Sequence, residues 1–341
     1  MDTKVAVVIL NWNGRQMLER FLGDVVRYSE APGVVVYVAD NGSTDDSIAV
    51  LERDFPSVRC ILLPENYGFA EGYNRALQQI EATYYVLLNS DVEVTEHWLE
   101  PLVQYMDCHP EVAACQPKLR DWNRRNWFEY AGASGGFIDR YGYPYCRGRI
   151  FGTLEEDHGQ YDDVTSVFWA TGAALFVRAI DYIEAGGLDG RFFAHMEEID
   201  LCWRLRSAGR GIVCIPQSVV YHVGGGTLKR ESPRKTFLNF RNNLLMLYKN
   251  LPEEELKSVL RVRAMLDYVA ALSFLLQGHL ANAREVLKAR KAFSRECAGY
   301  RADRERNLQR SVLNPIPEQK PVSILKAYYL KGQRLFSQLK A

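Results

Sequence analysis

Asp91, the first candidate for chemistry, follows an apolar run in the segment YYVLLNSDVEV, residues 84–94. Residues 84–88 are typical of a buried strand, which Asn89, Ser90 and Asp91 end abruptly. A lone carboxylate at this position could cap the next helix or hold a charged ligand. Mg²⁺ and Mn²⁺ often use only one or two protein carboxylates and take their other ligands from phosphates and water. Asp91 is therefore a candidate ligand of such a cation.

The best candidate for a second ligand is His222 in VVYHVGGGT. It follows an apolar run and precedes three glycines that would leave room for a ligand. Imidazole suits Mn²⁺ better than Mg²⁺. A histidine at the end of a strand is more often an ordinary surface residue, so the pattern alone leaves both interpretations open.

The densest group of acids lies in HMEEIDLCWR, where Glu197, Glu198 and Asp200 fall in the first turn of an expected helix. Acids at a helix N-terminus interact favourably with the helix dipole, which explains the cluster without any function. Three acids close to two phenylalanines instead favour a proton acceptor whose pKa is tuned by its surroundings.

Nucleotide binding is suggested by Asp40 in VADNGSTDDS, where a second apolar run turns into a helix. A carboxylate there can accept hydrogen bonds from a base or a ribose, although aspartate also commonly stabilises turns. Gly68 and Gly72 straddle the start of another helix, where a ligand could approach the backbone; close packing explains both glycines nearly as well. NWNG rather than GxGxxG follows the first run, which argues against a dehydrogenase-type dinucleotide fold.

Four apolar, β-branched runs alternate with stretches of helical spacing in the first hundred residues. The runs are residues 5–10, 34–39, 58–63 and 84–88, and the helical stretches are residues 15–28, 44–54, 70–81 and 95–106. Such repetition predicts an α/β fold with a mostly parallel, Rossmann-like sheet and helices on both faces. Ligands then bind outside the carboxyl ends of the strands, where Asn11, Asp40, Asn89 and Asp91 converge.

The later part of the chain is less regular. Residues 119–165 lack a long periodic run, which predicts loops and short strands lining an acceptor cleft. A strand is expected at residues 167–178, and wholly helical structure after Lys229 apart from a turn near residues 314–317. We expect an α/β domain over residues 1–228, with a nucleotide half at about 1–118 and an acceptor half at about 119–228, and a basic helical region over residues 229–341.

The 341-residue chain has no formal net charge, but its charges are segregated. Residues 1–228 carry 19 Lys and Arg against 32 Asp and Glu, whereas residues 229–341 carry 23 against 10. Seven cysteines without metal-binding spacing indicate reduced thiols and a cytosolic location. The N-terminal residues do not show the pattern of a signal peptide.

The basic C-terminal part predicts contact with an anionic membrane surface through residues 237–341. Residues 264–276 are apolar but too few to span a bilayer, which needs about 20 residues. The segment SILKAYYLKGQRLFSQLK mixes aromatic residues with lysines, as do helices that lie on membranes. A solvated helical face, a partner helix or a homodimer interface are alternatives; nucleic acid is not expected, because the front domain is acidic.

Seven segments of the chain resemble the inverting family-2 glycosyltransferases with the GT-A fold. They are, in the order of the family, VVILNWNG, VADNGSTDDS, ENYGFAEGYN, LLNSDVEV, WATGAALFVR, FFAHMEEIDLCWR and YHVGGG. The closest likeness is to the rhamnosyltransferase-like branch, which builds bacterial surface polysaccharides. The resemblance covers roughly residues 3–250 and implies a GT-A domain followed by a helical extension.

The resemblance implies a role for each matching residue. At the nucleotide it places Asn11, Asp40, Gly68, Gly72, Asn74, Asn89 and Asp91. Asp91 would be the surviving acid of the family's DxD-type motif, and His222 would complete the metal site. Glu198 would be the general base. In the sugar and acceptor pocket the resemblance places Trp169, Thr171, Gly172, Glu197 and Asp200.

Two residues depart from the family pattern. Asn89 stands where the family has the first acid of its metal-binding motif, and Glu198 stands where it has an aspartate. The base must lie within hydrogen-bond reach of the acceptor hydroxyl. The longer glutamate therefore leaves the base open between Glu198, Glu197 and Asp200.

The implied reaction is a single displacement, dependent on Mn²⁺ or Mg²⁺, that inverts the sugar. The donor would be a dTDP-, UDP- or GDP-linked sugar, with rhamnose one candidate, and the acceptor a glycan or a lipid-linked molecule. The enzyme would lie on the cytoplasmic face of a bacterial inner membrane. A catalytically inactive scaffold with the same fold is the main alternative. A nucleotidyltransferase would need a glycine-rich basic loop after the first strand, and a glycoside hydrolase would not need residues at the nucleotide edge.

Overall fold

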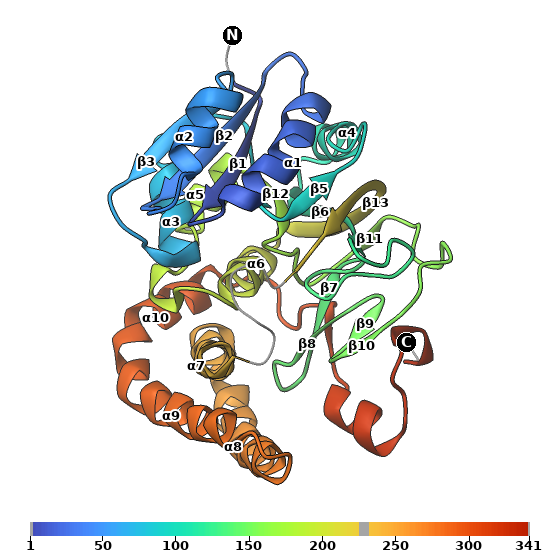
Figure 1. Cartoon of the computed structure of the whole chain (residues 1–341). Helices are drawn as coiled ribbons and strands as arrows, with labels where there is room; N and C mark the ends of the chain where they lie inside the picture. The colour runs from blue at the N-terminus through green and yellow to red at the C-terminus, as the bar shows by residue number, and fades with distance from the viewer. Residues whose placement is uncertain (1–2, 225–231, 340–341) are drawn as a thin grey trace.

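The computed structural model describes residues 3–224 and 232–339, and a mixed β-sheet forms its centre (Figure 1). The strands follow the order β11-β13-β6-β12-β4-β1-β2-β3, with β5 paired to β13. The predicted parallel unit is confirmed; it consists of β1 (Val5–Asn11), β2 (Val34–Asn41), β3 (Arg59–Leu63) and β4 (Tyr84–Asn89). The register aligns Asn11 with Asp40, so the polar residues at the strand ends share one edge.

The sheet is not parallel beyond β4. β12 (Ala174–Arg178) runs antiparallel to both β4 and β6 (Val112–Asp121). β13 (Gly211–His222) is parallel to β6, and the short strands β5 (Val92–Val94) and β11 (Thr165–Ser166) pair with it in antiparallel fashion. Because β5 follows Asp91 directly and aligns Val92 with His222, this pairing brings Asp91 and His222 together.

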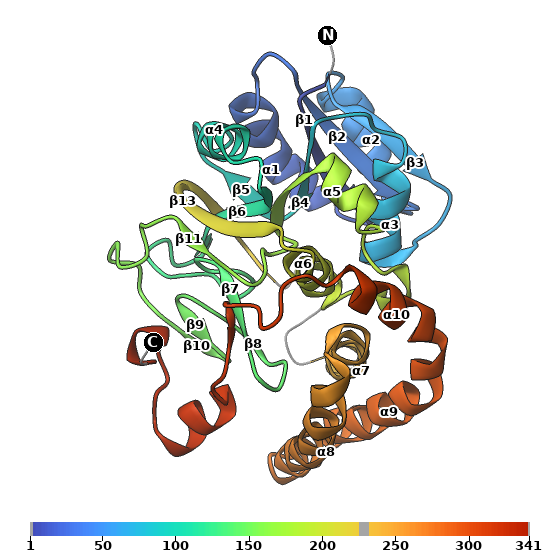
Figure 2. The same cartoon turned by 180° about the vertical axis from the view of Figure 1, so that it is seen from behind.

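Helices cover both faces of the sheet (Figures 1 and 2). Alternate residues of β1 enter two separate apolar cores: Val5 and Val7 one, Ala6 and Val8 the other. The first core is completed by α1 (Arg15–Tyr28), α2 (Ser47–Asp54) and α4 (Glu100–Cys108). The second is completed by α3 (Gly68–Leu77), α5 (Ala179–Glu184) and α6 (Glu197–Ser207). The fold class predicted from the sequence is thereby confirmed.

Two predicted elements are shorter than expected. Of the strand predicted at residues 167–178, only residues 174–178 form β12, because the backbone of Val167 and Phe168 pairs with Ile212 and Gly136 instead. The helix predicted at residues 95–106 begins at Glu100. The hydroxyl of Thr95 donates to the carbonyl of Val219 rather than capping that helix.

Residues 119–165 form the expected loops and short strands. Four of these strands build a small second sheet: β7 (Gly136–Asp139), β8 (Pro144–Cys146), β9 (Arg149–Ile150) and β10 (Thr153–Leu154). Its fifth strand, β14 (Gln319–Lys320), comes from much later in the chain and pairs in parallel with β7. The C-terminal part therefore adds a strand to the predicted acceptor half.

Four helices follow residue 232, as the sequence predicts. They are α7 (Pro233–Asn250), α8 (Glu253–Leu276), α9 (Leu280–Glu296) and α10 (Arg301–Arg310), with a 3₁₀ turn at Cys297–Tyr300 between the last two. In the described ranges, no helix is both long and apolar enough to cross a membrane. The expected boundary at residue 228 and the glycines Gly225 and Gly226 lie outside the described residues.

The prediction of wholly helical structure, which excepted a turn near residues 314–317, is wrong for most of residues 311–339, where only the short segments Lys326–Leu330 and Phe336–Gln338 are helical. After α10 the chain passes α6 and returns to the small sheet (Figure 2), where it forms β14 and short turns at Lys326–Leu330 and Phe336–Gln338. The Phe336 ring packs 5.5 Å from Phe137 and 5.6 Å from Tyr161, centroid to centroid. The alternation of aromatic residues and lysines in this segment thus reflects packing on the small sheet, not a long amphipathic helix.

Candidate active site

Asn11 and Asp40 form a buried pair at the carboxyl edge of β1 and β2. The Asn11 side-chain amide donates to Asp40 (3.0 Å) and to the Ser43 hydroxyl (3.2 Å), and Asp40 accepts from the Ser43 backbone N–H (2.9 Å). The side-chain oxygen of Asn11 is buried and has no hydrogen-bond partner among the described residues. A Cβ on Gly14 would lie 2.4 Å from that oxygen, so glycine is needed beside it. The edge therefore keeps an acceptor for an N–H or O–H group of a ligand.

Gly68, Gly72 and Asn74 have close packing partners. A Cβ on Gly68, whose φ is +78°, would lie 2.5 Å from the Phe193 ring, and one on Gly72 would lie 3.0 Å from the Asn41 side chain. The Asn74 amide pairs with both backbone groups of Leu188, at 2.8 and 3.0 Å. These contacts tie α3 to the chain that leads into α6, and the nucleotide role of the three residues stays a prediction.

Asp91 and His222 meet at the end of β4 and β13, with 3.1 Å between Asp91 Oδ1 and His222 Nε2. Both side chains are buried, and the opposite ring nitrogen, Nδ1, lies 3.3 Å from a Glu129 carboxylate oxygen. Burial disfavours a charged ring, but Glu129 and Asp91 outweigh it and raise the pKa of His222 well above its usual value. Burial would raise the pKa of Asp91, but the His222 cation lowers it below its usual value.

Glu129 is a residue that sequence reasoning missed. It lies in the stretch without periodicity, where no pattern distinguishes it from other acids. Its carboxylate accepts from the Ala131 backbone N–H at 2.5 Å, which holds it beside the histidine ring. A carboxylate on the second nitrogen of a ligating histidine fixes the orientation of the ring and makes it a better ligand.

Once His222 has released its Nε2 proton, the donor atoms of Asp91 and His222 fit a shared divalent cation. Two neighbouring ligands of an octahedral ion lie about 3 Å apart when each is about 2.1 Å from it, and these two atoms are separated by 3.1 Å. Over the part of the chain that the structure describes, no group of three or more His, Cys, Asp or Glu side chains could hold a metal by itself. An ion here would need further ligands, such as phosphate oxygens and water.

The predicted pocket residues Trp169, Thr171 and Gly172 lie in the segment between β11 and β12. The Trp169 indole N–H donates to the Phe137 carbonyl (3.0 Å), and the Thr171 backbone N–H donates to the Gln116 side chain (3.0 Å). The Asn89 backbone N–H donates to Ala173, so this segment abuts the end of β4. A Cβ on Gly172 would lie 3.6 Å from Glu198 Cβ, which places Gly172 directly against the start of α6. Trp169 is fully buried and belongs to the core.

Glu197 and Glu198 are the chemically unusual pair of the site. Each carboxyl has one buried oxygen, Oε2, without a hydrogen-bond partner among the described residues. Burial raises the pKa of Glu198 to about 7. Burial and then the charge of Glu198 raise the pKa of Glu197 well above its usual value. Near neutral pH, Glu198 is therefore the member of the pair that ionises first.

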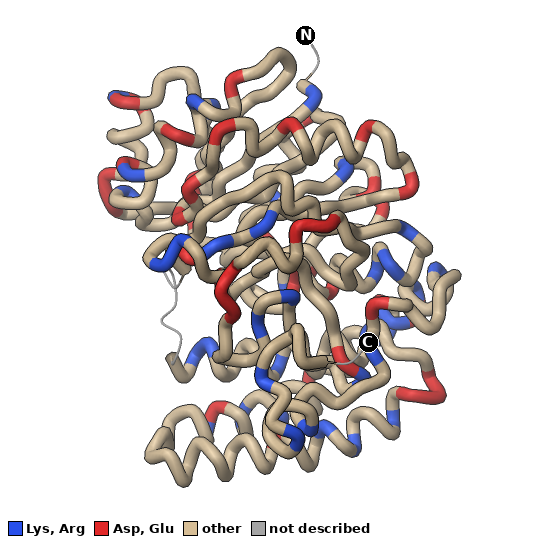
Figure 3. The backbone as a smooth tube through the Cα atoms, turned by 90° about the vertical axis from the view of Figure 1, so that its right-hand side faces the viewer, with Lys and Arg blue, Asp and Glu red and all other residues tan. Residues whose placement is uncertain are grey.

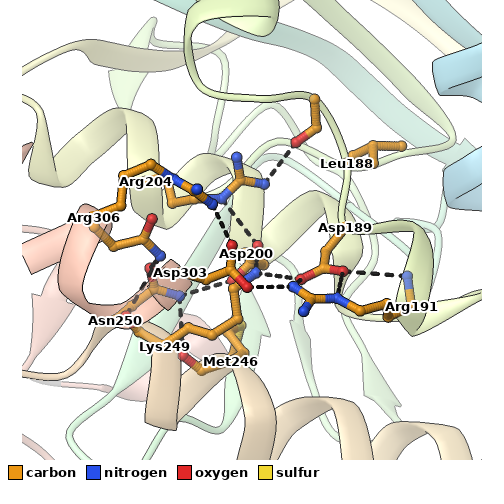
Figure 4. A network of polar contacts seen from close by, with 12 residues as sticks. Leu188, Asp189, Arg191, Asp200, Arg204, Met246, Lys249, Asn250, Asp303 and Arg306 are labelled. Atoms are coloured by element: carbon orange, nitrogen blue, oxygen red, sulfur yellow. Dashed lines mark hydrogen bonds and ion pairs between the residues drawn. The ribbon is translucent and has the colours of Figure 1, made fainter. Parts of the chain in front are cut away.

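Asp200 is held in a closed network of charges (Figure 4). Its carboxylate accepts from Arg204 (3.0 Å), Lys249 (2.7 Å) and Asn250 (2.8 Å), and Lys249 also binds Asp189 (2.8 Å). Asp200 is fully buried and both of its oxygens are bonded to fixed donors, so neither oxygen is exposed to a substrate. Its predicted place in the acceptor pocket has no support from these contacts, and the choice of base narrows to Glu197 and Glu198.

The chain just before α6 is strained. Phe193, His195 and Met196 all have positive φ angles, of 66°, 72° and 72°. Each such residue costs roughly 1–2 kcal/mol when it is not glycine, so other contacts must hold this loop. Burial and Lys235 lower the pKa of His195 to about 4, so its ring is neutral.

Asn242 of α7 supplies those contacts and was also missed by sequence reasoning. Its side-chain nitrogen lies 3.0, 2.9 and 2.8 Å from the carbonyl oxygens of Phe192, Ala194 and His195. Asn242 is fully buried. One α7 side chain thus fixes the loop that presents Glu197 and Glu198, and only the tertiary structure shows it.

The carboxyl edge of the parallel strands, with its polar residues, is where an α/β sheet of this kind binds ligands, and the sheet with helices on both faces has a GT-A-like architecture. The family model described as Glycosyl transferase family 2 matches residues 6–181, more than half of the chain. The chain belongs to glycosyl transferase family 2 and is a glycosyltransferase.

Relatives refine this assignment. The chain is 28% identical over 240 residues to an N-acetylglucosaminyl-diphospho-decaprenol L-rhamnosyltransferase of Mycobacterium tuberculosis, covering 65% of this chain and 76% of the relative. It is 26% identical over 163 residues to the rhamnosyltransferase WbbL of Escherichia coli, covering 46% and 61%. The resemblance to the rhamnosyltransferase-like branch is thereby confirmed.

Solved structures support the fold. Residues 1–349 of TarS from S. aureus, in complex with UDP-GlcNAc, match with a TM-score of 0.57 and 15% identity, covering 97% of this chain and 92% of that one. The mannosyltransferase PcManGT from Pyrobaculum calidifontis, in complex with GDP-Man and Mn²⁺, matches with a TM-score of 0.54 and 14% identity, covering 91% and 84%.

Proposed function

We propose that the protein transfers a sugar, with rhamnose as the first candidate, from a nucleoside-diphosphate donor to a hydroxyl of a glycan or lipid-linked acceptor, with inversion. The observation that carries this proposal is the buried Glu198 carboxyl, which has an unpartnered oxygen and a pKa raised to about 7 by burial. A general base works best when its pKa lies near the working pH. The relative that acts on a diphospho-decaprenol supports a lipid-linked acceptor in cell-surface polysaccharide synthesis.

The chain's own residues account for binding and proton transfer. Asn11 and Asp40 receive the nucleoside, and the ionised Glu198 takes the proton of the acceptor hydroxyl. The acceptor oxygen bonds to the anomeric carbon as the bond from that carbon to the diphosphate oxygen breaks, and the electron pair stays on the diphosphate. Attack from the face opposite the leaving group inverts the configuration.

Asp91 and His222 would hold a divalent cation, Mn²⁺ or Mg²⁺. Such an ion neutralises the charge that develops on the departing diphosphate. Neighbours of the same fold solved with UDP-GlcNAc, and with GDP-Man and Mn²⁺, support a nucleotide-sugar donor and a divalent cation.

Calorimetric titration with UDP, dTDP and GDP tests this proposal, first with Mn²⁺ and then with a chelator. We expect one nucleotide to bind in the presence of Mn²⁺ and to lose affinity in the chelator. That nucleotide would also narrow the choice of donor sugar. A folded protein that binds none of the three would instead support a scaffold that keeps the fold without catalysis.

Asn242→Ala is expected to lower kcat on the order of 10²-fold, because a base displaced by about 1 Å loses this much rate. The carbonyls of Phe192, Ala194 and His195 would lose their shared donor, and the strained loop would relax. Donor affinity, measured by calorimetry, should stay within about threefold of the native value.

The matched control is Asn282→Ala. Asn282 is another buried asparagine of the helical region, and it donates to Thr236 of α7 at 2.8 Å. Both variants should lose some thermal stability, and only Asn242→Ala should lose kcat per folded molecule. Equal turnover in the two variants would contradict a positioning role for Asn242.

The remaining parts of the assignment also stay proposals. We place the enzyme on the cytoplasmic face of a bacterial inner membrane, where a lipid-linked acceptor would be found, and associated with it peripherally. Neither the homodimer nor the division into residues 1–228 and 229–341 is needed for the proposed reaction.

A further inference from the structure

One face of α8 is apolar and open to solvent. Its side chains recur every three or four residues, so they line one side of the helix, and more than half of each is exposed: Met265, Tyr268, Val269, Leu272, Leu275 and Leu276. Leu276 is 79% exposed, and the stripe continues to Leu280 at the start of α9. The opposite side of α8 is buried through Leu256, Val259 and Ala271. The exposed stripe is therefore not the packing face of the helix.

Exposed basic side chains lie on both α8 and α9. Arg261 and Lys257 lie about one and two turns before Met265, respectively, on the same side of α8 and are exposed. The exposed side of α9 carries Arg284, Lys288 and Lys291. In Figure 3, the helices at the bottom of the molecule carry lysines and arginines beside a long stretch without charge.

Asp267, the one acid of α8 after its first turn, is turned inward. Between residues 256 and 284 the sequence has one acidic residue, Asp267. It is fully buried and paired with Arg263 (3.4 Å) and Arg290 (2.6 Å). In contrast, Lys257, Arg261, Arg284 and Lys291 form no ion pair with any described residue. Lys288 pairs with Glu285 (2.5 Å) and Glu254 is exposed at the start of α8, so the surface combines apolar side chains with an excess of positive charge.

We propose that this α8–α9 surface, defined by the exposed residues named above, docks on an anionic lipid bilayer with α8 lying flat on it. Apolar residues on one side and Lys or Arg at the border are the features by which a helix binds in the interface of an anionic membrane. No described helix could cross the bilayer, so the contact is superficial. The inference extends the lipid-linked acceptor of the proposed function by naming the surface that meets the membrane.

A second copy of the chain fits this surface less well than a membrane. The stripe from Met265 to Leu276 is roughly 16 Å long at 1.5 Å per residue and one helix of about 10 Å wide. The area of the stripe does not decide between the two occupants, because six large side chains are each more than half exposed, but its charge does. A symmetric dimer through α8 would bring its basic residues toward those of the other copy. An anionic bilayer attracts both the apolar stripe and the basic side chains of α8 and α9.

Flotation of the full chain with lipid vesicles tests the proposal, without nucleotide or acceptor. We expect binding to phosphatidylcholine vesicles that contain phosphatidylglycerol, weaker binding to phosphatidylcholine alone, and a loss of binding as salt screens the charges. The double variant Leu272→Asp with Leu276→Asp should lower the vesicle partition coefficient at least about tenfold, because two leucine side chains would no longer be buried in the bilayer. Arg284→Glu with Lys291→Glu should remove the preference for phosphatidylglycerol.

The matched control is Ile183→Asp. Ile183 of α5 is 61% exposed, much like the α8 leucines, but lies outside the surface. It should bind vesicles as the native protein does. Vesicle binding that is independent of phosphatidylglycerol, or unchanged by the leucine variants, overturns the proposal. The proposal is also overturned if the native protein does not bind vesicles but forms a dimer in sedimentation that the leucine variants abolish. Nucleotide titration of the same samples tests the proposed function separately. A protein that binds nucleotide but no vesicles contradicts the membrane proposal alone.

Discussion

Replacing Glu198 by glutamine is expected to abolish sugar transfer, lowering kcat by roughly 10²–10⁴-fold, the usual contribution of a general base. Glutamine keeps the size of the side chain but cannot accept the hydroxyl proton. In the native enzyme, kcat should fall tenfold per pH unit below about 7, because burial raises the pKa of Glu198 to about 7 and only its ionised form is active. The variant should lose this pH dependence, which a pH profile of kcat would show.

Glu197→Gln is the matched control for this prediction. Glu197 is buried next to Glu198, and both burial and the charge of Glu198 keep it protonated. Glutamine resembles a protonated carboxyl, so this variant should keep most of its activity. If Glu198→Gln turned over normally and Glu197→Gln did not, the assignment of the base would be reversed.

Stability provides a check on the folding of the Glu198 variant. The pKa of Glu198 rises from an unfolded value of 4.5 to about 7, so the native state holds a proton that the unfolded state releases. The native protein should therefore lose stability as the pH rises between about 4.5 and 7. Glu198→Gln lacks this titration. As the pH rises from about 4.5 to 7, the Tm of the variant should therefore increase relative to the Tm of the native protein.

Replacing Asp91 by alanine is expected to lower kcat on the order of 10²–10³-fold and to remove the effect of Mn²⁺ on nucleotide affinity. The Asp91 carboxylate and the His222 imidazole offer two donors 3.1 Å apart, and alanine leaves one of them. Without a cation, the diphosphate would have to leave with its charge uncompensated. Calorimetry with Mn²⁺ and with chelator measures the second effect directly.

Asp107→Ala is the control for Asp91. Asp107 also holds its partners at hydrogen-bond distance, Lys4 at 2.6 Å and Tyr84 at 2.7 Å, but at the opposite end of β4. Its loss should cost stability and leave the response to Mn²⁺ unchanged. An Asp91→Ala protein that still binds nucleotide more tightly with Mn²⁺ would show that the cation lies elsewhere.

The carboxyl edge of the sheet could be predicted from the sequence because its physics is local. Runs of β-branched residues specify the parallel strands, and the polar residues that directly follow each run, such as Asn11 or Asn89 to Asp91, must lie at the carboxyl edge. His222 could be found in the same way. The pairing of β5 with β13 that joins it to Asp91 involves a strand of three residues, too short to be recognised in the sequence.

The rest of the site depends on contacts between distant segments. Asp200 and Glu198 look alike in the sequence, and only Lys249 and Asn250, about one helix further on, show that Asp200 is neutralised. Glu129 lies in a stretch without periodicity, and Asn242 looks like any polar residue of an amphipathic helix. The secondary structure of residues 311–339 was predicted wrongly, because aromatic residues beside lysines fit both a membrane helix and a segment packed on a small sheet.

The strand β14 also constrains when the enzyme becomes complete during its synthesis. Gln319 pairs with Ile138, so the small sheet lacks its outer strand until the ribosome has passed residue 320. Proteins dominated by such long-range pairings fold slowly, because a long loop must close before the contacts form. A nascent chain would expose the edge of β7 throughout this interval, which makes that edge the place where newly made chains are most open to chaperones or to mispairing with one another.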